Sequence, residues 1–276
     1  MNAAFQDLCT RLQNAGVPDA RFDAAQLYRF VTGRDPRLDN GPSEAETARL
    51  DVLAARRANR EPLQYLLGEW DFLDFTLKVG PGVLCPRADS EVVCETAIEL
   101  LRAEEAPVVL DLCAGTGCLG LGIARAYPAA QVTCVEKSDS AWPYLTANTA
   151  GTGVQAVQAD VFGWYRVLAP ESVDLIISNP PYLTAAEMRV LMPETAHEPA
   201  LALNGGSDGL DFYRLLCSHY GGVLRPGGWL VLEIGCAQAA SVLALGRQYG
   251  WQNGRCRKDY GGTDRVIVLQ KPQKSG

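Results

Sequence analysis

The first 70 residues place apolar side chains at the spacing of amphipathic helices. Apolar positions recur three and four residues apart, and runs of β-branched residues are almost absent. Two such series are Phe5, Leu8, Cys9 and Leu12, and then Phe22, Ala25, Leu27, Tyr28 and Val31. Ser43 and Glu46 have the spacing of a capping box, which predicts a further helix over residues 44–59. This part of the chain is therefore expected to fold as a small helical bundle.

The pattern changes to alternation between residues 70 and 83. Apolar side chains are interleaved with polar ones, and the stretch ends at Gly80-Pro81-Gly82. The apolar members are Phe72, Phe75, Leu77 and Val79. Such a pattern is typical of a hairpin or a linker, so we expect a domain boundary here.

Beyond this boundary, short apolar runs alternate with stretches at helical spacing. Six runs are expected to be strands, namely residues 108–113, 131–137, 154–160, 173–179, 229–235 and 265–270. Alternation of strands and helices predicts an α/β fold, in which helices cover both faces of a mostly parallel sheet.

Length and composition fit a folded protein of about two domains. The chain has 276 residues, of which 47% are hydrophobic and 21% charged, and this excludes wholesale disorder. Its 25 Lys and Arg are outnumbered by 32 Asp and Glu, giving a formal charge of -7. An acidic balance argues against a partner held by phosphate neutralisation, so stable nucleic-acid binding is not expected.

The sequence shows no targeting or metal-binding pattern. It begins without a basic and apolar leader and has no uncharged apolar run of about 18 residues, so we expect a cytoplasmic protein that does not bind membranes. The nine cysteines are scattered and lack zinc-ligand spacing, which predicts free thiols and no metal site. His197 and His219 lie in no recognisable catalytic motif.

A glycine-rich turn follows the first expected strand of the sheet. The run Cys113-Ala114-Gly115-Thr116-Gly117 leads from this strand into an apolar helix. Glycines at such a turn let the backbone approach a ligand above the helix N-terminus. Residues 115–120 also match the G-x-G-x-x-G pattern, with Glu136 at the end of the next strand as a ribose-binding acid. By itself the turn is compatible with dinucleotide binding and with a purely structural role.

Two further carboxylates favour S-adenosylmethionine over a dinucleotide. Asp111 stands two residues before the turn, and Asp160 ends the third expected strand. Asp111 can orient the turn or meet the cationic methionine end of the ligand. Glu136 can accept hydrogen bonds from both ribose hydroxyls, and Asp160 can lie beside the adenine amino group. The alternative is that Asp111 and Asp160 cap a following turn or helix.

A proline-rich turn, Asn179-Pro180-Pro181-Tyr182, follows the fourth expected strand, where open α/β sheets bind ligands. Two consecutive prolines remove N–H donors and fix the backbone, which leaves the carbonyl groups of the turn free of any ladder. The Asn179 side-chain oxygen and a turn carbonyl, most simply that of Pro180, can accept both N–H bonds of a planar amino group. The Tyr182 ring can stack on its face. This arrangement suits methylation of a conjugated nitrogen, because it orients a poor nucleophile for in-line attack.

With these motifs the sequence resembles the bacterial glutamine N5-methyltransferases that modify peptide chain release factors. The resemblance covers nearly the whole chain. It is carried by residues 60–68, 84–91, 111–117, 179–182, 198–201, 205–211, 225–228, 232–235 and 264–266. The Asn-Pro-Pro-Tyr turn also occurs in DNA adenine methyltransferases, so the flanking motifs and the helical N-terminal region make the distinction.

The resemblance implies three segments. These are an N-terminal helical substrate-docking domain over 1–72, a β-hairpin linker over 73–90, and a seven-stranded Rossmann-like domain over 91–276 that uses S-adenosylmethionine. The implied substrate is the glutamine of the Gly-Gly-Gln motif of class 1 peptide chain release factors. We expect the enzyme to act as a monomer.

The resemblance also assigns the site. Cofactor contacts are expected at Cys113, Ala114, Gly115, Thr116, Gly117, Glu136, Val161 and Asn179, beside the acids Asp111 and Asp160. The target glutamine is expected to be held by Asn179, Pro180, Pro181 and Tyr182, of which Asn179, Pro180 and Tyr182 are catalytic. Cys113 replaces the first turn glycine usual in the family, and Glu136 replaces its common aspartate. Arg87 and Glu91, four residues apart, are expected to form an ion pair at a helix start or to close the cofactor site.

Three other functions stay open from the sequence. One is glutamine methylation of a ribosomal protein. Another is N6-methylation of DNA adenine, which requires a flipped base in the same turn and is disfavoured by the acidic composition. The third is a non-catalytic regulator that binds S-adenosylmethionine or a dinucleotide, for which an intact turn over 179–182 has no purpose.

Overall fold

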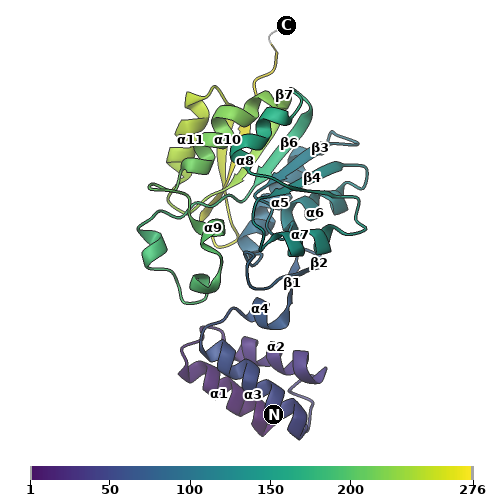
Figure 1. Ribbon diagram of the computed structural model, residues 1–276, viewed down its shortest axis with the longest axis vertical. Helices are drawn as coiled ribbons and strands as arrows, with labels where there is room; N and C mark the ends of the chain where they lie inside the picture. The colour runs from purple at the N-terminus through teal and green to yellow at the C-terminus, as the bar shows by residue number, and fades with distance from the viewer. Residues whose placement is uncertain (1, 275–276) are drawn as a thin grey trace. The chain divides into compact units, whose positions relative to one another are not determined.

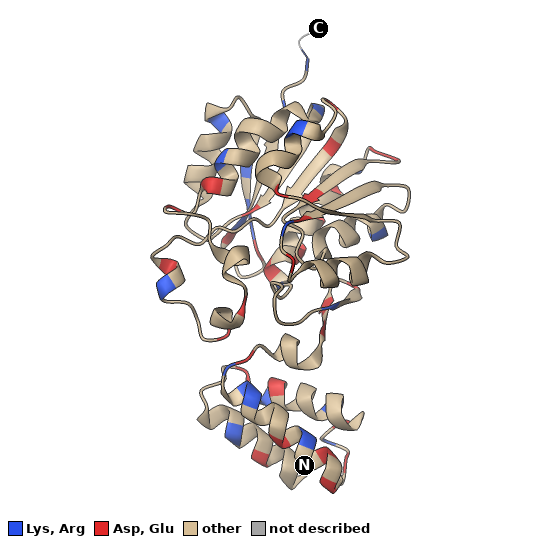
Figure 2. Ribbon diagram, viewed as in Figure 1, with Lys and Arg blue, Asp and Glu red and all other residues tan. Residues whose placement is uncertain are grey.

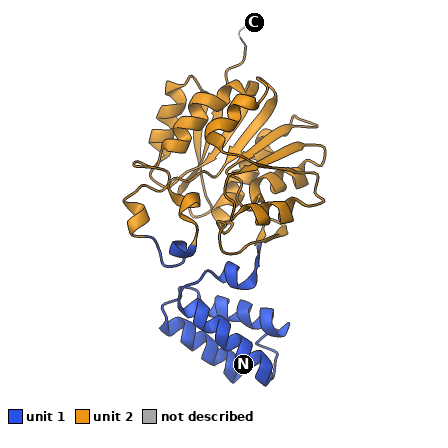
Figure 3. Ribbon diagram, in the orientation of Figure 1, with its two compact units in different colours: residues 1–70, 191–197 blue, residues 71–190, 198–276 orange. Residues whose placement is uncertain are grey.

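The computed structural model describes residues 2–274 and divides the chain into two compact units (Figures 1 and 3). One unit extends to Trp70 and also contains residues 191–197. The other comprises residues 71–190 and the chain from Glu198 onward. The expected segments 1–72, 73–90 and 91–276 stay a prediction of domain organisation, to which the structure adds the short segment 191–197.

The first unit is the expected helical bundle. It consists of α1 (Ala3–Asn14), α2 (Ala20–Thr32), α3 (Glu44–Ala58) and α4 (Leu63–Leu67). Apolar side chains spaced along α1 and α2, including Phe5, Leu12 and Leu27, are buried together in its core. The predicted capping box is present at α3, because the Ser43 side chain accepts from the Glu46 N–H and the Glu46 side chain accepts from the Ser43 N–H.

Residues 191–197 are held in this unit by a buried charge cluster. Arg57, which is 5% exposed, donates to Asp23 over 2.6 Å and to Glu194 over 2.9 Å. Arg60 donates to both carboxylate oxygens of Glu194, over 2.7 and 2.8 Å. Because a buried guanidinium must be paired, Glu194 fixes this segment on the bundle.

The second unit begins with the expected hairpin, β1 (Glu69–Phe72) and β2 (Phe75–Lys78), of which β1 starts within the first unit. A seven-stranded sheet follows, in the order β5-β4-β3-β6-β7-β9-β8. Its strands are β3 (Val108–Leu112), β4 (Gln131–Glu136), β5 (Gln155–Gln158), β6 (Val173–Ser178), β7 (Leu224–Glu233), β8 (Gln252–Lys258) and β9 (Asp264–Gln270). The β3, β4, β5, β6 and β7 pairings are parallel, whereas β9 is antiparallel to β7 and β8.

All six expected strands are confirmed, and β8 is the strand that sequence reading missed. Its residues, Gln252–Lys258, are mostly polar and exposed, because β8 is an antiparallel edge strand that pairs only with β9. A strand that buries neither face lacks the apolar alternation by which strands are recognised.

Helices cover both faces of the sheet (Figure 1). They are α5 (Ala88–Leu100), α6 (Cys118–Ala126), α7 (Trp142–Thr149), α8 (Val161–Trp164), α10 (Asp211–His219) and α11 (Ala239–Gln248). A further short helix, α9 (Ala200–Leu203), lies between β6 and α10 in the chain. Short 3₁₀ turns lie at Tyr165–Val167, Glu187–Arg189, Thr195–His197 and Tyr220–Gly222.

Alternate residues of the central strands supply two separate cores. Val109, Leu175 and Ile177 pack with α5, α6 and α7, whereas Leu110 and Ile176 pack with α10 and α11. This is the alternation expected of strands buried on both faces. All nine cysteines have free thiols. Among residues 2–274, no helix is long and apolar enough to cross a membrane.

Candidate active site

The topology of the sheet brings the two sequence motifs together. The chain runs outward from β3 through β4 to β5 and then returns to β6 on the other side of β3. Leu112 and Ser178 are partners in the parallel register of β3 and β6. The next residues, Cys113 and Asn179, therefore leave the sheet side by side at its carboxyl edge. Ligands of open α/β sheets bind at such a switch point.

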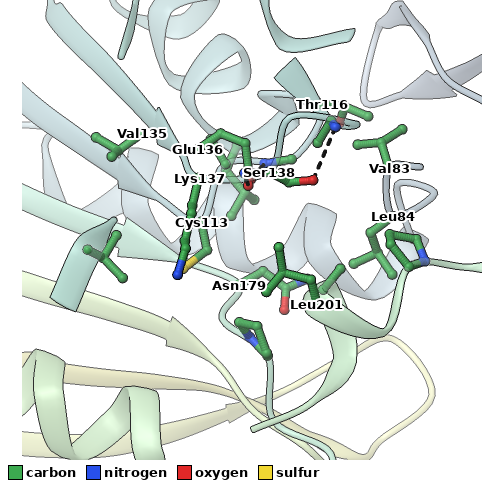
Figure 4. A pocket seen from close by; sticks show the side chains of 18 of the residues that line it. Val83, Leu84, Cys113, Thr116, Val135, Glu136, Lys137, Ser138, Asn179 and Leu201 are labelled. Atoms are coloured by element: carbon green, nitrogen blue, oxygen red, sulfur yellow. Dashed lines mark hydrogen bonds between the residues drawn. The ribbon is translucent and has the colours of Figure 1, made fainter. Parts of the chain in front are cut away.

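A cavity lies at this edge, and its empty space amounts to about 990 Å³ when the part open to solvent is included. Figure 4 shows Cys113, Glu136 and Asn179 among its walls. Of the expected site residues, its lining includes Cys113, Ala114, Gly115, Thr116, Glu136, Asp160, Val161, Asn179 and Pro181. Asp111, Gly117, Pro180 and Tyr182 are not among the lining residues. The structure thus brings nine of the thirteen expected residues to one cavity.

The glycine-rich turn has a backbone that most residues cannot adopt. Gly117 has a φ of 83°, and a Cβ at this position would lie 2.8 Å from a methyl carbon of Leu145. Cys113 has a φ of 61°, in the left-handed region that favours glycine. The turn is thus fixed by Gly117, while Cys113 carries backbone strain.

Glu136 is joined to the turn by hydrogen bonds. Its Oε2 accepts from the Gly115 N–H over 2.8 Å, and its Oε1 accepts from the Ser138 N–H over 2.7 Å. Each carboxylate oxygen has a further lone pair, so both can accept a hydroxyl from a ligand in the cavity. Glu136 thus connects the end of β4 to the turn after β3 and still offers two acceptors.

Asp111 is fully buried beneath the turn. Its Oδ2 accepts from the Gly120 N–H over 2.9 Å, which holds the first turn of α6. Its Oδ1 has no hydrogen-bond partner among residues 2–274, and burial raises the pKa of this carboxyl to about 7. Of the two roles expected for Asp111, these contacts support the orientation of the turn.

Asp160 lines the cavity and already has two partners. Its Oδ1 accepts from the Phe162 N–H over 3.0 Å and caps α8, and its Oδ2 accepts from Lys137 over 2.8 Å. The capping alternative considered from the sequence therefore describes its contacts in the structure.

The proline-rich turn is packed from behind. Pro180 and Pro181 are buried, and the carbonyl of Tyr182 accepts from the Gln238 side chain over 3.0 Å. A Cβ on Gly205 would lie 2.7 Å from the Tyr182 Cα. Burial raises the pKa of Tyr182 to about 12. The turn is therefore rigid and its phenol neutral.

Asn179 is one of the residues that line the cavity, and its side-chain nitrogen donates to the Ser90 hydroxyl over 3.3 Å. Ser90 in turn donates to the buried carboxylate of Glu233 over 2.5 Å. Ser90 lies at the start of α5 and Glu233 at the end of β7. Both residues lie in stretches that carry the family resemblance, 84–91 and 232–235, but sequence reading assigned neither of them a role, because no local spacing connects positions 143 residues apart.

The expected ion pair between Arg87 and Glu91 is wrong. Arg87 binds Glu198 over 2.5 Å, and Glu91 instead accepts from the backbone N–H of Leu73 over 2.9 Å. The Glu198 side chain, only 1% exposed, also accepts from the Cys85 N–H over 3.0 Å. The fully buried carboxylate of Glu198 has no access to water and takes the guanidinium, whereas the partly buried Glu91 is satisfied by the backbone N–H of Leu73.

Comparison with known proteins places the chain among methyltransferases. Residues 75–202 match the family described as Methyltransferase small domain, and residues 3–68 match the PrmC N-terminal domain. A release factor glutamine methyltransferase from Geobacter sulfurreducens is 39% identical over 93% of this chain and 91% of its own length. A protein of the same name from Gloeobacter violaceus is 39% identical over 93% of each chain.

A solved structure supports the fold. The crystal structure of a methyltransferase from Pyrococcus furiosus covers 71% of this chain and 88% of its own, with a TM-score of 0.51 and 18% identity. At this identity the likeness concerns the arrangement of sheet and helices alone.

Proposed function

Because the chain belongs to the family of release factor glutamine methyltransferases, we propose that it methylates the side-chain amide nitrogen of a glutamine. The proposed donor is S-adenosylmethionine, and the proposed substrate is the glutamine of the Gly-Gly-Gln motif in class 1 peptide chain release factors. One observation carries the proposal. Asn179 stands at the carboxyl end of β6 in the same cavity as the glycine-rich turn and Glu136.

The cavity suits S-adenosylmethionine by the chemistry of its lining. Glu136 offers two acceptors to the ribose hydroxyls, and the glycine-rich turn lets the backbone approach the ligand. Val135, Leu201 and Phe212 supply apolar walls for the adenine. When bound, S-adenosylmethionine supplies a methyl group made electrophilic by its sulfonium.

The residues of the proline-rich turn orient the acceptor nitrogen. An amide nitrogen shares its lone pair with the carbonyl group, so it is a poor nucleophile unless its geometry is fixed. We assign the Asn179 side-chain oxygen and the Pro180 carbonyl as acceptors for its two N–H bonds. The same two dipoles face the positive charge that develops on the nitrogen, and they are already oriented before reaction.

No histidine takes part in this scheme. His197 contacts the backbone carbonyl of Asn59 in the helical unit, and His219 packs its ring 4.6 Å from the Tyr165 ring. Neither belongs to the cavity lining. When the amide nitrogen takes the methyl group from the sulfonium, a neutral thioether leaves and the nitrogen carries a positive charge. This N-protonated methylamide is strongly acidic, so water suffices to accept its proton and leave the neutral methylamide.

We further propose that the helical bundle docks the release factor, because the local amide is the same on every glutamine and selectivity needs additional contacts. Phe22 and Phe30 on α2 are 50% and 45% exposed and are candidates for this surface. Substituting both with serine should lower kcat/KM for an intact release factor and leave a short glutamine peptide unaffected. Val52→Ser on α3, where the valine is 60% exposed, is the matched control.

A monomer acting in the cytoplasm is the proposed form, since release factors work where translation takes place. Stable binding to DNA or RNA is not part of the proposal. Lys and Arg are interspersed with Asp and Glu on the ribbon of each unit (Figure 2), in keeping with the formal charge of -7.

The direct test offers labelled S-adenosylmethionine with three acceptors: a class 1 release factor, ribosomal proteins, and DNA. We expect one methyl group on the Gly-Gly-Gln glutamine, located by mass spectrometry, and none on a release factor whose glutamine is changed to alanine. Label on ribosomal protein or on DNA adenine, with the release factor unmodified, would contradict the proposal.

A further inference from the structure

A chain of buried polar groups leads from Asn179 through Ser90, both of which line the cavity, to Glu233, which is not among the lining residues. The Asn179 side-chain nitrogen lies 3.3 Å from the Ser90 oxygen, which lies 2.5 Å from Oε2 of Glu233. Ser90 and Glu233 are each 2% exposed. The three residues come from the end of β6, the start of α5 and the end of β7. Their meeting is therefore a product of the tertiary fold.

The donor and acceptor properties of these groups fix the direction of each hydrogen bond between them. An ionised carboxylate can only accept hydrogen bonds, so Ser90 must use its single hydrogen toward Glu233. The lone pairs of the Ser90 oxygen are then left to accept, and only the nitrogen end of the Asn179 amide can donate to them. The oxygen end of that amide is consequently the end available to a ligand in the cavity.

We propose that Glu233 is a positioning residue for methyl transfer, which acts through Ser90 to keep the oxygen of Asn179 facing the substrate amide. The inference rests on the proposed function, because it concerns how Asn179 accepts an N–H bond of the target glutamine. Glu233 itself touches neither substrate nor cofactor in this scheme.

Protonation of Glu233 removes the constraint that fixes the orientation of the Asn179 amide. A protonated carboxyl can donate to Ser90, and Ser90 can then donate to the oxygen of an inverted Asn179 amide. An inverted amide presents N–H groups to the N–H groups of the substrate, so no hydrogen bond forms. The relay thus requires an ionised Glu233, and turnover should fall as the pH drops through the pKa of this carboxyl.

Burial raises the pKa of Glu233 to about 7, while the Ser90 hydrogen bond and Arg265 oppose the rise. Charged and titratable groups near Glu233 come from each element packed against it. They are Asp89 and Arg87 at the start of α5, Arg265 on β9, Tyr182 of the turn, Tyr213 on α10 and Cys118 on α6. Asp89 raises the pKa of Glu233 and Arg87 lowers it, and burial is the largest of all these influences.

The test compares Ser90→Ala and Glu233→Gln with the wild-type enzyme on an intact release factor. Ser90→Ala removes the acceptor for Asn179, and Glu233→Gln replaces an obligate acceptor with a group that can also donate to Ser90. In both variants kcat should fall at least about tenfold, while calorimetry finds the Kd for S-adenosylmethionine within about twofold of wild type. The acid limb of the kcat profile near pH 7 should disappear in Glu233→Gln.

Two variants serve as controls. Ser90→Thr keeps the hydroxyl and should restore most of the kcat that Ser90→Ala loses. Thr96→Val removes another buried hydroxyl of α5, which donates to the Val92 carbonyl and accepts from Arg257, and neither partner belongs to the relay. This variant should leave kcat unchanged. If Glu233→Gln does not fold, Ser90→Ala decides, since it deletes a single atom.

Unchanged kcat in Ser90→Ala would overturn the relay, and so would a loss confined to the Kd for S-adenosylmethionine, which would make Ser90 a cofactor contact. A wild-type pH profile in Glu233→Gln would likewise refute the role of the carboxylate. Each of these results is measured against glutamine methylation by the wild-type enzyme. Failure of that reference reaction would refute the proposed function instead.

Discussion

Replacing Glu136 by alanine should weaken S-adenosylmethionine binding strongly, because one side chain serves two purposes. Its two oxygens already hold the Gly115 and Ser138 N–H groups, over 2.8 and 2.7 Å. Each oxygen has a second lone pair, and Glu136 lines the cavity in which we place the ribose hydroxyls. The substitution removes the charged acceptor of the ligand and also the connection between β4 and the glycine-rich turn.

The magnitude follows from the charge on the acceptor. A hydrogen bond to a charged group contributes about 1.5–3 kcal/mol. Since about 1.4 kcal/mol corresponds to a tenfold change in affinity, Kd should rise about 10-fold to 150-fold. The loss should not fall below this range, because the released turn must also be ordered again when the ligand binds.

Isothermal titration calorimetry of the free enzyme with S-adenosylmethionine measures this change directly. Asp139→Ala is the matched control, because it removes an exposed carboxylate three residues further along the chain that lies outside the cavity lining. The control should keep the wild-type Kd, and a thermal scan of both variants should show cooperative unfolding. A wild-type Kd in Glu136→Ala would show that the acid at the end of β4 does not bind the ribose.

Three further outcomes are expected. Asn179→Ala should lower kcat about 100-fold or more, with only a small change in the calorimetric Kd for S-adenosylmethionine, because the substrate amide loses one of its two acceptors. In denaturant titrations the free energy of unfolding should be about 1 kcal/mol higher for Cys113→Gly than for Cys113→Ala. Both variants lose the thiol, but only alanine keeps a Cβ at a φ of 61°. The pKa of Asp111 is raised to about 7 in the folded chain, whereas in the unfolded chain an aspartate loses its proton near pH 4. The stability that the protonated Asp111 contributes is therefore lost as the pH rises from about 4 to about 7. Asp111→Asn should therefore flatten the decline in unfolding free energy over that range, and equal slopes for both proteins would contradict this.

The architecture was predictable where local pattern and burial agree. Strands such as β3 and β6 are mostly apolar because both faces are covered. The glycine-rich turn was recognisable because a left-handed backbone at Gly117 favours glycine. The polar edge strand β8 gave no such signal. The attachment of residues 191–197 to the helical unit could not be predicted either, because it depends on the hydrogen bond between Arg57 and Glu194, which are 137 positions apart.

The candidate site likewise has residues that the sequence predicts and residues that only the tertiary structure reveals. Cys113, Glu136 and Asn179 each end a strand or follow one directly, and parallel strands bring such positions to one edge, so sequence order alone predicts that they meet. The groups that hold these residues obey no such rule. A spacing of four residues made Glu91 the expected partner of Arg87, yet the partner is Glu198, 111 positions away. Spacing along the chain identifies only which side chains are near in sequence. Tertiary structure decides which carboxylate is most deeply buried, and that carboxylate has the greatest need of a partner. Ser90 and Glu233 follow the same logic, which is why the orientation of Asn179 can be derived from the fold and not from the motif that contains it.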